Sequence, residues 1–230
     1  MTRKLVFWTA FNCFQSERAM RQVQPGDPHP VTTLEWTETR IKYFKRFNLP
    51  AILQQTYEDF LYMVIMDPST RAMTDRLMPR VDDRIIYVYD DPFGLDILRR
   101  FDEVVYALID SDDMYSIHAG EIMMIPDNAE WMTFRYGYAY DYFRGRLFHY
   151  DTIFNGPFFA HRLDPKTMKF FDREKRHPGH KSVARYNPQE LPAGNFCVLL
   201  HDRNTSSHPG MKHVSKIRAD NKILQRDFGL

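Results

Sequence analysis

Three carboxylates follow one apolar segment of strand length: Asp110, Asp112 and Asp113 come directly after residues 104–109. Carboxylates this close repel one another, so a positive partner is expected to neutralise them. Mg²⁺ and Mn²⁺ take oxygen ligands and bridge phosphates, so the cluster predicts a divalent cation beside a phosphorylated substrate. The alternative is a solvated acidic turn in which Asp113 caps the next helix.

The first half of the chain alternates strand and helix patterns. Near-continuous apolar segments predict buried strands, and amphipathic segments, the first capped by Thr33, predict helices between them. This alternation predicts an α/β fold with a mainly parallel sheet and helices on both faces. The strands are expected at residues 5–10, 60–66, 84–89 and 104–109, and the helices at 34–47, 70–78 and 95–101.

The second half follows a different pattern. After a helix expected at residues 115–124 come aromatic, partly alternating segments, which predict a mixed or antiparallel extension of the sheet. They cover residues 131–143, 147–150 and 156–161. The last strand is expected at residues 196–200, ending at His201, and the tail from residue 208 is expected to be weakly structured.

The composition restricts the function. Lys and Arg total 31 and Asp and Glu 30, a net charge of +1, which argues against a nucleic-acid partner held by phosphate contacts. Two cysteines cannot build a disulfide framework or a cysteine zinc site. We therefore expect a cytoplasmic protein, and the sequence shows neither a transmembrane segment nor a cleavable signal peptide. Nothing in the sequence predicts an oligomeric state.

Two segments together resemble a known family. The first lies within residues 40–60, and the second is the acidic cluster; they read Leu49-Pro50-Ala51-Ile52-Leu53-Gln54-Gln55-Thr56, followed by Asp59-Phe60, and Asp110-Ser111-Asp112-Asp113. Both resemble the bacterial rhamnosyltransferase family, which is similar to GT-A and family 2 glycosyltransferases. The resemblance covers residues 5–125 well and is thinner from 126 to 230. It implies one GT-A-like domain over residues 1–230, with 1–125 binding nucleotide-sugar and 126–230 on the acceptor side.

The resemblance also implies a ligand set. Asp110 and Asp112, extended by Asp113, would hold Mn²⁺ or Mg²⁺, with His201 completing the metal site. Asp110 would also contact the ribose and diphosphate of a UDP- or dTDP-linked donor, whose sugar the family label suggests is rhamnose. Asp67 would contact the nucleotide base. The plainer alternative for His201 is a strand-end histidine that is hydrogen-bonded to a loop. For Asp67 it is an aspartate that starts a turn.

Two arginines are candidates for gripping the diphosphate. Arg18 and Arg40 lie on or near expected loops at this edge of the sheet. Their positive charges suit phosphate oxygens. Ordinary surface charge is the alternative for both.

The general base has three candidates. Inverting enzymes need one near the acceptor hydroxyl, and the Glu-Asp pair usual in family 2 is absent from residues 172–184. His180, Asp172 and Asp141 are the candidates. The departure leaves the base and the stereochemical outcome open, and a loop histidine without a catalytic role is the alternative for His180.

The leading hypothesis is a metal-dependent glycosyltransferase. The acceptor hydroxyl would belong to a glycan, a small molecule, a protein or a modified nucleobase. One alternative is a nucleotidyltransferase or phosphohydrolase with the same acidic metal site, although no glycine-rich phosphate loop is present. Another is a non-catalytic nucleotide-sugar-binding module, which the missing Glu-Asp pair favours.

Overall fold

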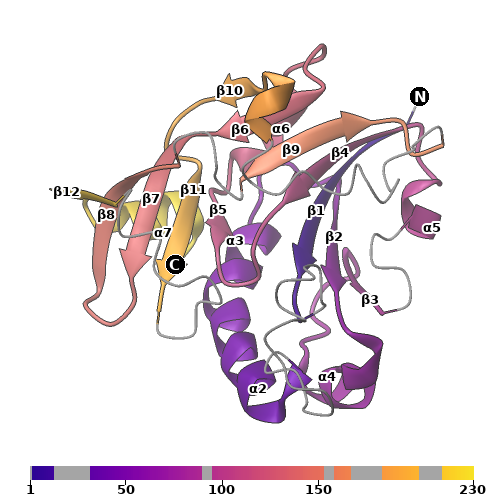
Figure 1. Ribbon diagram of the computed structural model, residues 1–230, viewed down its shortest axis with the longest axis horizontal. Coiled ribbons are helices and arrows are strands. Elements are labelled where there is room, and N and C mark those ends of the chain that lie inside the picture. The colour runs from indigo at the N-terminus through magenta and orange to yellow at the C-terminus, as the bar shows by residue number, and fades with distance from the viewer. Residues whose placement is uncertain (1, 13–31, 90–94, 153–157, 167–182, 202–213) are drawn as a thin grey trace.

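The computed structural model describes residues 2–12, 32–89, 95–152, 158–166, 183–201 and 214–230 (Figure 1). They form a mixed α/β structure with two sheets. The larger has the order β10-β6-β9-β4-β1-β2-β3. Its strands are β1 (Arg3–Ala10), β2 (Phe60–Ile65), β3 (Ile85–Val88), β4 (Glu103–Leu108), β6 (Trp131–Phe134), β9 (Phe159–Leu163) and β10 (Gln189–Leu191).

The four strands expected in the first half are confirmed as neighbours in this sheet. β1 pairs in parallel with both β2 and β4, and β2 pairs in parallel with β3. β9 then runs antiparallel between β4 and β6. The α/β class is therefore confirmed, and the carboxyl ends of β1, β2, β3 and β4 lie at one edge.

The smaller sheet is built mainly from the second half of the chain. Its order is β12-β8-β7-β11-β5, with β5 (Met114–Tyr115), β7 (Tyr136–Asp141), β8 (Arg146–Asp151), β11 (Phe196–Leu200) and β12 (Val214–Arg218). The aromatic segment 131–143 is divided between the two sheets, as β6 and β7. A Cβ at Gly137 would lie 2.6 Å from the Phe196 carbonyl oxygen, so only glycine lets β7 pass this close to β11.

One long helical segment lies between the sheets. It runs through α2 (Leu34–Tyr43), a π-helical turn (Phe44–Asn48) and α3 (Leu49–Leu53). Phe44 packs into the core of the large sheet, and Phe47 into that of the small sheet. The predicted cap is confirmed, because the Thr33 hydroxyl accepts from the Trp36 amide at 3.3 Å. Leu34 is 52% exposed, so it does not belong to the apolar face.

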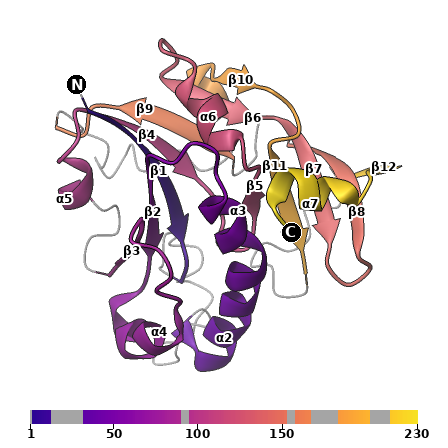
Figure 2. The ribbon, with the colours of Figure 1, turned by 180° about the vertical axis from the view of Figure 1, so that it is seen from behind.

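Shorter helices cover the remaining faces. They are α4 (Arg71–Leu77), α5 (Leu95–Leu98), α6 (Ala119–Met124) and α7 (Lys222–Phe228). The helix expected at 115–124 begins later, because Tyr115 pairs with β11. The expectation of a weakly structured tail is wrong for β12 and for α7, and α7 lies against the small sheet (Figure 2). Leu224 and Phe228 of α7 are buried in the core of that sheet.

Candidate functional site

The acid turn, residues 110–113, leaves the carboxyl end of β4 and is buried at all positions but the first. Ser111 is inaccessible, and Asp112 and Asp113 are each 4% exposed; Asp110 lies at the surface. The Asp113 amide donates to the Asp110 carbonyl at 3.0 Å and closes the turn. A solvated acidic turn is therefore wrong for Asp112 and Asp113.

Asp112 is held by two groups from distant parts of the chain. The Arg40 guanidinium forms an ion pair with its Oδ2, and Arg40 Nε donates to Ser111 Oγ at 2.8 Å. His201 Nε2 lies 2.7 Å from the same oxygen. Burial opposes the charge, but the Arg40 charge and the His201 hydrogen bond lower the pKa of Asp112 below its usual value. Asp112 therefore carries the negative charge of the buried turn.

Asp113 has a different role. Its Oδ1 accepts from the Leu199 amide at 2.9 Å, which ties the turn to β11. Burial raises the pKa of Asp113 well above its usual value, and the neighbouring charges of Asp112 and Asp110 raise it further. The side chain therefore anchors the small sheet to the turn.

His201 directly follows the last residue of β11. Its ring packs against Tyr43 of α2 at a tilt of 30° with centroids 4.1 Å apart, and its side chain is inaccessible. β7 and β11 run in parallel, and Leu200 pairs with Asp141. The carboxyl ends of β7 and β11 therefore lie on the side of the acid turn.

The four predicted metal ligands do not converge. Within the described ranges, no group of three or more His, Cys, Asp and Glu side chains could hold a metal ion. Of the four predicted ligands, Asp112 and His201 form a carboxylate–imidazole pair. Mg²⁺ sites commonly use one or two carboxylates plus substrate phosphates and water, and imidazole suits Mn²⁺ better than Mg²⁺. In this structure His201 Nε2 and Arg40 both contact Asp112 Oδ2, so a shared cation would have to displace one of these contacts. Asp113 is turned to β11 and would not join such a site.

The other predicted residues lie as follows. Asp67 accepts from the Ser69 amide at 2.9 Å and caps a short 3₁₀ turn after β2. Both carboxylate oxygens of Asp141 accept from Arg144, each at 3.0 Å, across the turn between β7 and β8. These bonds agree with turn-forming roles for the two aspartates. Arg18, Asp172 and His180 lie outside the described residues.

Three residues of the site were missed in the sequence. Ser111 contacts Arg40, and Tyr43 contacts His201. Asn48 is a buried amide beneath the acid turn. One signal was present: Arg40 and Asn48 are polar residues among the apolar positions of one helical segment. A uniform helical period does not predict that these two residues share a face, because a π-helical turn lies between them.

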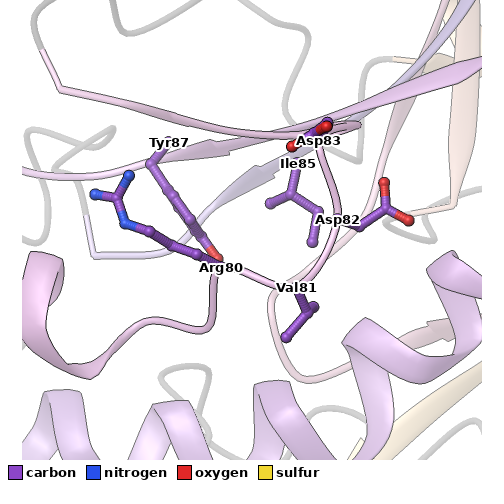
Figure 3. Close-up of a pocket in the computed structure, with 6 residues that line it drawn as sticks. All are labelled: Arg80, Val81, Asp82, Asp83, Ile85 and Tyr87. Carbon is purple, nitrogen blue, oxygen red and sulfur yellow. The ribbon is translucent and has the colours of Figure 1, made fainter.

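A cavity of about 420 Å³ lies elsewhere, around the start of β3 (Figure 3). Arg84 Nη2 donates to Asp82 Oδ2 at 2.8 Å in the loop that lines it. The cavity is at the amino end of β3, whereas the acid turn is at the carboxyl end of the parallel strand β4, so the two are separate. Its lining consists of Arg80, Val81, Asp82, Asp83, Ile85 and Tyr87.

No protein-family model matches the chain, and a comparison with curated proteins finds no significant match. Among the described residues, no helix combines the length and apolar character needed to cross a membrane.

Proposed function

We propose that this chain is a metal-dependent glycosyltransferase with a GT-A-like fold. It would move a sugar from a UDP- or dTDP-linked donor, with rhamnose as the first candidate, to an acceptor hydroxyl. The supporting observation is the buried Asp112 carboxylate, held between Arg40 and His201 at the carboxyl edge of the parallel strands. Ligands of open α/β sheets bind at this edge.

The donor would bind where three elements meet. Asp112 and His201 would hold Mn²⁺ or Mg²⁺ on the diphosphate, and the cation, when bound, supplies Lewis-acid stabilisation of the leaving group. Arg40 would turn one N–H of its guanidinium from Asp112 to a phosphate oxygen, a charge-assisted hydrogen bond for which arginine is suited. The surface position of Asp110 suits the ribose hydroxyls, and Asp67, at the end of β2, would contact the base.

The acceptor side is proposed to be the small sheet. Asp141 is the one candidate base among the described residues, at the end of the strand beside β11. Its two oxygens bond Arg144, so it would act only after that contact opens. Proton transfer from the acceptor hydroxyl to a carboxylate is the step that the base must perform.

The test is product analysis with a panel of UDP- and dTDP-sugars and Mn²⁺, with and without saccharide acceptors. The proposal expects release of UDP or dTDP, lost in Asp112→Asn. Release of pyrophosphate from a nucleoside triphosphate would instead identify a nucleotidyltransferase. Donor binding without turnover on any acceptor would identify a binding module.

A further inference from the structure

Asn48 is a fully buried amide directly beneath the acid turn. Its Nδ2 donates to the Asp110 carbonyl at 3.0 Å and to the Asp113 carbonyl at 2.8 Å, so it grips both ends of the turn. Its Oδ1 accepts from the Tyr62 hydroxyl of β2 at 2.5 Å. Because the amide oxygen is taken by a donor, the nitrogen must face the two carbonyls.

The π-helical turn explains how Asn48 reaches this position. Eight residues separate Arg40 from Asn48, and two turns of a regular α-helix take 7.2 residues, an overshoot of about 80°. The wider turn of Phe44–Asn48 rotates less per residue and removes part of that overshoot. Arg40 and Asn48 therefore both face the acid turn, Arg40 toward its side chains and Asn48 toward its backbone.

We propose that Asn48, oriented by Tyr62, is the positioning residue that sets the acid turn for binding the donor. The inference deepens the proposed function and rests on it, because the ligand that reports it is a nucleotide. Asn48 acts through the backbone: it fixes the two carbonyls, so the Asp112 side chain between them meets Arg40 and His201 at the observed distances.

The main test uses a variant that removes both partners of the buried bond. Asn48→Leu with Tyr62→Phe keeps the side-chain sizes close and leaves neither side chain with an unpaired polar group. It also removes both donors to the Asp110 and Asp113 carbonyls, so folding stability is expected to fall, and binding is compared once circular dichroism shows that the variant is folded. The affinity for UDP or dTDP with Mn²⁺ is expected to fall about ten- to a hundredfold, as for other residues that orient metal ligands. Wild-type affinity in the folded double variant would overturn the proposal.

Gln55 offers a matched control. It is also a buried amide, donating to the Ser116 carbonyl at 2.6 Å and accepting from the Gly120 amide at 2.8 Å, outside the acid turn. Gln55→Met removes these bonds at similar length. It is expected to lower stability while leaving nucleotide affinity unchanged, and an equal loss of affinity would overturn the positioning role.

A second readout works without any ligand. His201 reports the acid turn through its contact with Asp112, so its imidazole NMR signals at fixed pH should move in the Asn48/Tyr62 double variant and stay in place in Gln55→Met. If the wild type binds no nucleotide, the proposed function fails, while the His201 signals still decide the positioning. Unmoved signals in the double variant would overturn it.

Discussion

Two aspartate–arginine pairs in this protein differ in what holds them. Asp112 and Arg40 are 72 residues apart in sequence, and their side chains are 6% and 10% exposed. Asp82 and Arg84 are two residues apart, 23% and 31% exposed, and lie beside the cavity of about 420 Å³. In the first pair the carboxylate also meets His201; in the second it also accepts from the Arg84 backbone amide.

The two pairs differ in how much of the fold each one needs. The Asp82–Arg84 pair closes a local turn and uses only neighbouring residues. The Asp112–Arg40 pair forms only when α2, β4 and β11 pack together. Its two charges are therefore buried by the tertiary structure and not by a local turn. Such an arrangement is costly unless every charge is matched, which makes it a better indicator of function.

The largest expected difference between the two pairs concerns stability. Arg40→Ala leaves a buried carboxylate without its cation and is expected to lower the free energy of unfolding by about 3–5 kcal/mol. Arg84→Ala removes a partly exposed partner and should cost about 1 kcal/mol or less. Urea unfolding of both variants measures this, and equal losses would contradict the distinction.

A smaller effect tests which aspartate carries the charge of the acid turn. The pKa of Asp113 is raised in the folded state, so its stabilising contribution is present below its unfolded pKa of about 3.8 and is lost as the pH rises toward the folded value. Asp113→Asn keeps an oxygen for the Leu199 amide and lacks this titration. Its stability relative to wild type should therefore increase above pH 4, by up to about 1.4 kcal/mol per pH unit.

Urea unfolding between pH 4 and pH 7 measures that difference. A pH-independent difference between Asp113→Asn and wild type would show that Asp113 is ionised as readily in the folded chain as in the unfolded one. The buried turn would then carry two charges, unlike the single carboxylate of the Asp82–Arg84 pair.

The smallest expected effect is on binding at the cavity side. Asp82→Asn removes the charge from the local pair at the amino edge of the sheet, far from the acid turn. Nucleotide affinity should stay within about twofold of wild type, less than 0.5 kcal/mol. A tenfold loss in Asp82→Asn, measured by calorimetry, would place the ligand at the cavity.

Local patterns were sufficient to predict much of the sheet. The parallel strands β1, β2, β3 and β4 are apolar segments of strand length separated by helices, and both signals depend only on neighbouring residues. The division of residues 131–143 between two sheets was missed, because it depends on Gly137 passing close to Phe196, far along the chain.

The sequence predicted which residue types form the site, but it predicted fewer of the contacts between them. The resemblance to glycosyltransferases implied that Asp112 and His201 lie together, and the structure brings them to 2.7 Å. The role of Asp113 could not be read, because its partner is the Leu199 amide, and backbone amides are present at every residue except proline. Asn48 was missed because its direction depends on a π-helical turn.

The central claim is that Asp112 forms the binding site for a metal-bound nucleotide. The most direct test is calorimetric titration of UDP and dTDP, with and without Mn²⁺, into wild type, Asp112→Asn and the matched Asp82→Asn. We expect Mn²⁺-dependent binding that is lost in Asp112→Asn and retained in Asp82→Asn. A folded wild type without such binding, or an Asp112→Asn variant that binds as the wild type does, would contradict it.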